Sequence, residues 1–143
     1  KDVLPYCIEN DIGVVGYSPL AQGILTGKFS RDYAFKEEDK RKNTPLFSEE
    51  HFGKCLEVAD KLKSYAALYG KTPGQVAINW ATSQTGMTSA IAGARNPSQV
   101  VENIGAAGWR LEKDHIKEID LIGRTVTDSL PMYETFFSRK IKE

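Results

Sequence analysis

Apolar side chains in the middle of the chain recur every three or four residues, the spacing that places them on one face of a helix. The residues of this series are Phe52, Leu56, Ala59, Leu62, Ala66 and Tyr69. Gly70 follows at once, and a glycine after the last periodic residue is a common helix stop. The pattern therefore predicts a long amphipathic helix that packs against a core.

Two short apolar runs lack this period and predict strands instead. Val14 and Val15 are β-branched and follow Gly13, which breaks the preceding helical pattern, and a second apolar run occupies residues 88–92. Unbroken runs of this kind are typical of strands that are buried on both faces of a parallel sheet. Parallel strands are joined by crossover helices. The chain is therefore expected to be an α/β protein with parallel strands at residues 14–17 and 88–92.

Two helix starts repeat one scheme: a capping residue, a proline at the first helical position, and a glutamine three residues after the cap. They occupy residues 72–75 (TPGQ) and 96–99 (NPSQ). The first predicts a helix that runs to about Gln84, and the second predicts a helix directly after the second strand. A last helix is expected where Ile116, Ile119 and Ile122 fall on one face.

Residues 24–48 are polar and irregular, and they lack either period. Loops of more than about 12–15 residues without structure of their own are uncommon in compact domains. We expect this segment to be either a functional lid or a mobile segment.

Composition and charge exclude several classes of function. The 143 residues include 41% hydrophobic and 27% charged residues, the composition of one globular domain. Nineteen basic residues balance nineteen acidic ones, so no overall positive field draws the chain to nucleic acid or to a membrane surface. The longest apolar runs are also far shorter than the roughly 18 residues of a membrane span. Neither nucleic acid nor a membrane is expected as a partner.

Cysteine and histidine are sparse. Cys7 and Cys55 have neither the number nor the spacing of a disulfide framework or a zinc site, so we expect small core residues in a reducing, cytoplasmic setting without a metal. His51 and His115 fall within polar helical stretches, and a surface position is expected for both.

Two clusters of candidate binding residues each follow a predicted strand. After the first come Tyr17, Ser18 and a loop limited by proline and glycine; after the second come Gly93 and Arg95 at a helix start. Ligands of parallel α/β folds bind at this end of the strands, and a helix N-terminus with an arginine suits a phosphate. Taken singly, each cluster could equally be an ordinary turn with a half-buried tyrosine or a solvated arginine.

Three motifs in order resemble the aldo-keto reductase family. They are residues 15–28 (VGYSPLAQGILTGK), 72–80 (TPGQVAINW) and 91–103 (IAGARNPSQVVEN). The resemblance spans about residues 2–130. The chain resembles the bacterial and potassium-channel-β-like branches of the family more than the mammalian steroid reductases. It implies that residues 1–143 form the C-terminal part of a TIM (β/α)8 barrel, with about two strand–helix units plus a C-terminal helix. The N-terminal part of the barrel is then absent.

The resemblance also implies a cofactor, NADPH, and residues that hold it. Tyr17 corresponds to the aromatic residue that stacks on the nicotinamide. The segment that holds the pyrophosphate corresponds to Ser18, Pro19, Leu20, Ala21, Gln22 and Lys28. Gly93, Arg95 and Gln99 match the group around the adenosine 2′-phosphate, and Glu102 and Asn103 match the pair that contacts the adenine. Arg41 lies in the long loop with which relatives clasp the cofactor. Ala92 replaces the proline of many relatives, which would loosen this turn.

The family reduces aldehydes and ketones to alcohols with a tyrosine proton donor, a lysine, an aspartate and a histidine. None of these catalytic residues can be assigned in this sequence, because in the family they lie on earlier strands. We therefore expect the chain to supply the cofactor-binding part of an NADPH-dependent oxidoreductase of small carbonyl substrates and to be inactive alone. The alternatives are a non-catalytic nucleotide-binding or regulatory module, or an inactive truncated fragment.

A parallel sheet of two strands would leave both edges and much apolar surface unpartnered. Exposed apolar patches on soluble domains promote association. We therefore expect either self-association or a missing N-terminal segment that covers this surface.

Overall fold

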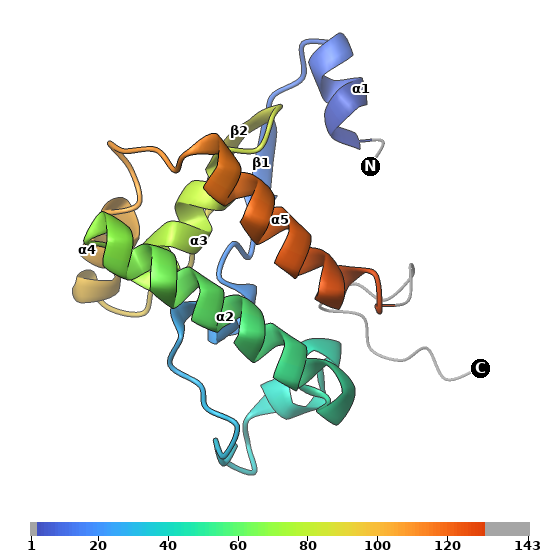
Figure 1. The fold of residues 1–143 in the computed structure, drawn as a ribbon, viewed down its shortest axis with the longest axis vertical. Coiled ribbons are helices and arrows are strands. Elements are labelled where there is room, and N and C mark those ends of the chain that lie inside the picture. Colours follow the sequence, from blue (N-terminus) through green and yellow to red (C-terminus); the bar gives the residue numbers. More distant parts are fainter. Residues whose placement is uncertain (1–2, 131–143) are drawn as a thin grey trace.

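The computed structural model describes residues 3–130, and it is an α/β arrangement with two strands in this part of the chain. Figure 1 shows α2 and α5 side by side, with the two strands behind the first half of α5 and α1 standing apart at one end. The α-helices are α1 (Val3–Glu9), α2 (Glu49–Tyr69), α3 (Pro73–Thr82), α4 (Pro97–Ile104) and α5 (Lys113–Thr127). The strands are β1 (Val14–Tyr17) and β2 (Met87–Ile91). Three short 3₁₀ helices are η1 (Ala21–Thr26), η2 (Lys40–Asn43) and η3 (Pro45–Phe47).

The two strands are parallel, as the sequence predicts. Val14 pairs with Met87 and Tyr17 with Ile91, with an irregularity after Val14 where the hydroxyl of Thr88 accepts a hydrogen bond from the Val14 backbone N–H at 2.9 Å. The second strand begins one residue before the predicted start. Because the strands are parallel, their carboxyl ends lie side by side, and the loops that follow them open on the same side of the sheet.

The expectation that both strand faces are buried is wrong for the part of the chain described. Val15, Tyr17 and Ile91 are 54%, 62% and 61% exposed. Helices cover the opposite face of the sheet, where Gly16 and Ala90 are half-buried. The apolar runs therefore mark strands that have a helix layer on one face only within residues 3–130.

The helices follow the sequence signals closely. Thr72 and Gln75 form the predicted capping box of α3, and Asn96 accepts a hydrogen bond from the Gln99 backbone N–H at the start of α4. Gly70 ends α2 in the left-handed conformation. The α3 helix stops at Thr82, slightly before the expected end. Two apolar clusters, which meet at Leu25, join α2 to η1, α3 and α5.

Residues 24–48 are not a structureless segment. They contain η2, η3 and the end of η1, and their aromatic rings pack on one another and on the start of α2. Phe29 lies edge-on to Tyr33 and Phe47, with ring centroids 4.7 and 5.5 Å apart. Edge-to-face contacts of this kind add to the burial of apolar area. The aromatic residues, which the helical and strand patterns did not reveal, give this loop its structure.

Cys7 and Cys55 are buried free thiols, as expected. The surface position predicted for His51 is wrong, because only 5% of this residue is exposed. Its ring lies 3.0 Å from the Ser48 hydroxyl and 3.3 Å from the Ser129 carbonyl oxygen. Ser129 is far away in sequence, so a pattern of neighbours could not show that it covers the ring. His115 is half-buried and contacts the Tyr69 hydroxyl at 2.7 Å.

Candidate functional site

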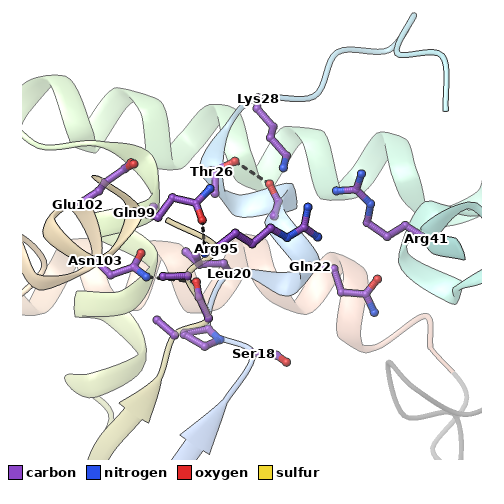
Figure 2. A pocket seen from close by; sticks show the side chains of 16 residues that line it. Ser18, Leu20, Gln22, Thr26, Lys28, Arg41, Arg95, Gln99, Glu102 and Asn103 are labelled. Atoms are coloured by element: carbon purple, nitrogen blue, oxygen red, sulfur yellow. Dashed lines mark hydrogen bonds between the residues drawn. The ribbon is translucent and has the colours of Figure 1, made fainter. Parts of the chain in front are cut away.

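A cleft of about 750 Å³ opens where the loops after β1 and β2 meet the 3₁₀ segment. It collects most of the candidate residues that the sequence analysis singles out. Those that line it are Ser18, Pro19, Leu20, Gln22, Lys28, Arg41, Gly93, Arg95, Gln99, Glu102 and Asn103. Figure 2 shows the side chains of Lys28, Arg41 and Arg95 reaching into the same space from three different segments.

Two predicted cofactor residues lie beside the cleft. Tyr17 and Ala21 line a neighbouring apolar cavity of about 380 Å³ between the sheet and helices α2, α3 and α5. Ser18 and Pro19 border both spaces. Tyr17 lies at the end of β1 and is 62% exposed.

The loop after β1 has an unusual backbone. Ser18, Ala21 and Gln22 adopt positive φ angles of 57°, 45° and 56°, and Gly23 follows at 96°. Such conformations are costly for residues other than glycine, and they concentrate at binding and catalytic sites. The Thr26 hydroxyl donates to the Gly23 carbonyl at 2.7 Å and closes the turn (Figure 2). This hydrogen bond stabilises the end of a loop whose backbone angles are uncommon for residues other than glycine.

The loop after β2 is organised by side chains of α4. Gln99 accepts a hydrogen bond from the Arg95 backbone N–H at 2.7 Å, and Asn103 donates to the Gly93 carbonyl at 3.3 Å (Figure 2). Asn96 caps the helix by accepting from the Gln99 N–H at 3.0 Å. The Arg95 side chain is therefore displayed at the N-terminus of a helix, where an anion is favoured.

Positive charge dominates the middle of the cleft. Burial first, and then the nearby charges of Arg41 and Arg95, lower the pKa of the Lys28 ammonium. Arg41 pairs with Asp39 through hydrogen bonds that raise the pKa of Arg41 and lower that of Asp39 to about 2. A cleft that gathers three cations, two of which lower the pKa of Lys28, is well placed to bind a polyanion such as a phosphate chain.

Glu102 brings a carboxylate to the far end of the cleft. Its carboxylate accepts a hydrogen bond from the Thr72 hydroxyl at 3.1 Å, and its backbone carbonyl accepts one from the Gln75 amide at 2.9 Å. The capping box of α3 therefore also holds α4. A carboxylate at this place can accept hydrogen bonds from an amino group of a base.

Sequence reasoning missed several residues that contribute to the cleft. Thr26, Gly74 and Ala94 line it, and Asp39 and Thr72 hold two of its charged side chains. Asp39 lies only two residues before Arg41, a local signal that could have suggested the pair. The contact of Thr72 with Glu102 carries no such signal, because thirty residues separate them.

Two tyrosines with acidic, basic or histidine neighbours lie elsewhere, between α2 and α5. Tyr65 donates to Glu118 at 2.6 Å beside Lys61, and Tyr69 contacts His115. These groups lie between α2 and α5, and none of them lines the cleft. Within residues 3–130 there is also no cluster of three potential metal ligands and no helix long and apolar enough to cross a membrane.

Comparison with known proteins decides the family. The model of the Aldo/keto reductase family matches residues 1–124. The chain belongs to the aldo/keto reductase family. Its fold also superposes on the structure of the glycerol dehydrogenase AKR11B4 from Gluconobacter oxydans with a TM-score of 0.79 and 34% identity. That match covers 96% of this chain and 41% of the dehydrogenase, so the two strand–helix units and α5 correspond to part of an aldo-keto reductase barrel.

Aldo-keto reductases similar to this chain differ in their cofactor. The aldo-keto reductase yakc [NADP(+)] from Schizosaccharomyces pombe is 35% identical over 82% of this chain and 34% of its own length. The NADH-specific methylglyoxal reductase of Escherichia coli is 36% identical over 78% of this chain and 33% of its own length. The chain spans about a third of the length of these curated relatives. Family membership therefore indicates a nicotinamide cofactor without deciding between the two forms.

Proposed function

We propose that residues 1–143 are a partial aldo-keto reductase domain that holds NADPH in an enzyme reducing aldehydes and ketones to alcohols. The observation that carries this proposal is the convergence of Lys28, Arg41 and Arg95 on one cleft at the ends of two parallel strands. A dinucleotide with a 2′-phosphate carries phosphate charge at two places, and separate basic groups suit such a ligand.

The cleft residues fit an extended dinucleotide. Lys28 and the strained loop of residues 18–23 are assigned to the pyrophosphate, because oriented amides and a cation bind phosphate oxygens. Arg95 at the start of α4 is assigned to the 2′-phosphate, supported by Gly93 and Gln99. Glu102 and Asn103 are assigned to the adenine, Tyr17 to the nicotinamide, and Arg41 to the loop that clasps the cofactor. When bound, the cofactor supplies the hydride that a carbonyl carbon accepts.

We place the proton donor and its tuning groups on strand–helix units outside these residues. The tyrosines paired with Glu118 and His115 lie between α2 and α5, away from the cleft. A small carbonyl compound is the proposed substrate of the whole enzyme. The remaining barrel units, or a second copy of the chain, would cover the exposed face of β1 and β2. For the location we propose the cytoplasm, because the two buried thiols are free.

The same placement of the tyrosines favours a second candidate function. The chain would then be a non-catalytic module that binds the nucleotide and acts on a partner. Both candidate functions use the cleft to bind the nucleotide, but only the reductase would turn over a carbonyl substrate. An inactive truncated fragment is the third possibility, and it would bind no nucleotide specifically.

Calorimetric titration of the 143-residue chain with NADPH and NADH tests the proposal. We expect saturable binding that is tighter for NADPH, together with no reduction of 4-nitrobenzaldehyde by the chain alone, because the proton donor is missing. Turnover that appears only when the upstream barrel units are added supports the reductase, whereas binding without any turnover supports the module. If the chain binds neither NADPH nor NADH, the proposed cofactor-binding role of the cleft is wrong.

A further inference from the structure

Asp39 and Arg41 form a closely fitted pair at the edge of the cleft. The Arg41 Nε donates to the Asp39 carboxylate at 2.8 and 3.1 Å, and Nη2 donates to the same carboxylate. The Arg41 backbone N–H also donates to Asp39 at 3.1 Å, so the carboxylate caps η2 as well. The side chains of both residues are largely buried, with 17% of Asp39 and 25% of Arg41 exposed.

The pair is fixed further by aromatic rings. The Arg41 guanidinium carbon lies 5.2 Å from the centroid of Phe29 and 6.0 Å from that of Phe47. A guanidinium over a ring face gains electrostatic attraction. Phe29 and Phe47 belong to the buried cluster that joins η1 to α2, so they are themselves held in place.

The Arg41 guanidinium nevertheless lies near two other positive charges, which repel it. Lys28 and Arg95 project into the same space, and Figure 2 shows all three charged ends directed toward one another. Like charges at short range repel, and the lowered pKa of Lys28 reflects this repulsion after burial. An arginine with many rotamers would escape the repulsion by turning toward solvent unless another group retained it. Asp39 supplies such a group through its carboxylate, and the Tyr33 side chain makes a further hydrogen bond to Arg41.

We propose that Asp39 is a positioning residue that holds the Arg41 guanidinium against the cleft, ready for a phosphate group of a nicotinamide dinucleotide. This inference rests on the proposed function of the cleft. Asp39 engages the Nε–Nη2 edge of the guanidinium, and a guanidinium has five N–H donors in a planar fork. N–H groups therefore remain for a phosphate, while the carboxylate sets their direction before the ligand arrives. Preorganisation of this kind improves affinity by removing an ordering cost.

Titration of the 143-residue chain with NADPH and with inorganic pyrophosphate tests the proposal. The variants are Asp39→Ala, Arg41→Ala and the combination of the two. Asp60→Ala is the matched control, because Asp60 forms an exposed pair with Lys63 on α2. We expect Asp39→Ala to weaken binding of both ligands by on the order of tenfold, although it removes a negative charge from the site. Asp60→Ala is expected to leave affinity unchanged.

The double variant separates positioning from a general effect on the loop. If Asp39 acts through Arg41, the chain with both substitutions binds as weakly as Arg41→Ala alone, and no weaker. Asp39→Asn, which keeps an acceptor oxygen, is expected to recover part of the affinity. Tighter binding by Asp39→Ala, or an equal loss in the presence and absence of Arg41, overturns the proposal.

The two ligands also distinguish this inference from the proposed function. If the unmodified chain binds pyrophosphate but neither dinucleotide, the proposed function fails, and the role of Asp39 is judged on the pyrophosphate titrations. If it binds none of them, both proposals fail.

Discussion

Arg95 is presented to the cleft from the start of α4, while Gln99 holds its backbone N–H. NADPH differs from NADH by a 2′-phosphate, which a positioned guanidinium can bind through charged hydrogen bonds. In the chain or in a longer enzyme that contains it, we expect Arg95→Ala to weaken NADPH binding by about 1.5–3 kcal/mol. NADH binding is expected to change little. Fluorescence quenching with each cofactor provides the measurement.

Arg110→Ala serves as the control, since Arg110 is exposed and does not line the cleft. It removes the same charge and is expected to leave both affinities unchanged. Equal losses for NADPH and NADH in Arg95→Ala would show that this residue maintains the shape of the loop and does not bind the 2′-phosphate.

Asp39 also predicts a dependence of stability on pH. In the folded state, its hydrogen bonds with Arg41 lower the pKa of the Asp39 carboxyl from the ordinary value of 3.8 to about 2. Because folding lowers the pKa of the Asp39 carboxyl, the ionised carboxylate stabilises the folded state. This stabilisation is complete at pH values above the pKa of the unfolded state and is lost as the pH falls toward 2. We expect the urea midpoints of the chain and of Asp39→Asn to differ most near neutral pH and to converge as the pH falls through this window. A difference that does not vary with pH would contradict this account.

The contact between α3 and α4 depends on a glycine. A Cβ atom on Gly105 would lie 2.2 Å from the Gln75 side-chain nitrogen, which donates to the Glu102 carbonyl. The backbone of Gly105 is in the right-handed helical region, so a side chain is opposed by contacts and not by the backbone angles: the Gln75 amide, and the Glu102 carbonyl oxygen at 3.2 Å. We expect Gly105→Ala to displace Gln75 and to destabilise the fold by about 1–2 kcal/mol through the lost hydrogen bonds. Chemical unfolding measures this loss.

Gly123→Ala provides a control of opposite sign. Gly123 lies inside α5, and within residues 3–130 no atom beyond its chain neighbours and its own helix backbone lies within 4 Å of an added Cβ. Alanine is favoured over glycine within a helix by about 0.5–1 kcal/mol. We therefore expect Gly123→Ala to stabilise the fold. If Gly105→Ala stabilises it by a similar amount, the Gln75 contact contributes nothing to the joining of α3 and α4.

At the scale of the molecule, apolar side chains are exposed on one face of the sheet and on α4. Those on the sheet are Val15, Tyr17 and Ile91, and those on α4 include Val101 and Ile104. Exposed apolar surface with open strand edges favours association. We expect the 143-residue chain to sediment as a concentration-dependent mixture of species. A single monomeric species at every concentration, with cooperative melting, would contradict this prediction.

A substitution on the sheet can locate the surface responsible. Val15→Thr keeps a β-branched residue in β1 but places a hydroxyl on the exposed face. We expect it to weaken association more than Leu121→Ser, which alters an exposed apolar residue on α5 away from the sheet. Equal effects would show that no single surface drives association.

Much of the helical structure follows from neighbouring residues. The caps at Thr72 and Asn96 and the stop at Gly70 act within one turn of chain, so their signals are local and the structure confirms them. The parallel strands also follow from the apolar runs and the helices between them. The aromatic packing of residues 24–48 was not predicted, because Phe29 and Phe47 meet without any helical or strand period.

The sequence by itself determined the α/β class, the helix starts and the motifs that place candidate binding residues after each strand. Only the tertiary structure decided that Lys28, Arg41 and Arg95 reach into one cleft and that Asp39 holds one of them. It also decided that Thr72 bonds to Glu102 and that Ser129 covers His51. The physical reason is the separation along the chain of the residues that interact. Caps and periods depend on contacts within a few residues, whereas convergence of charges and burial of a side chain depend on segments that only packing brings together.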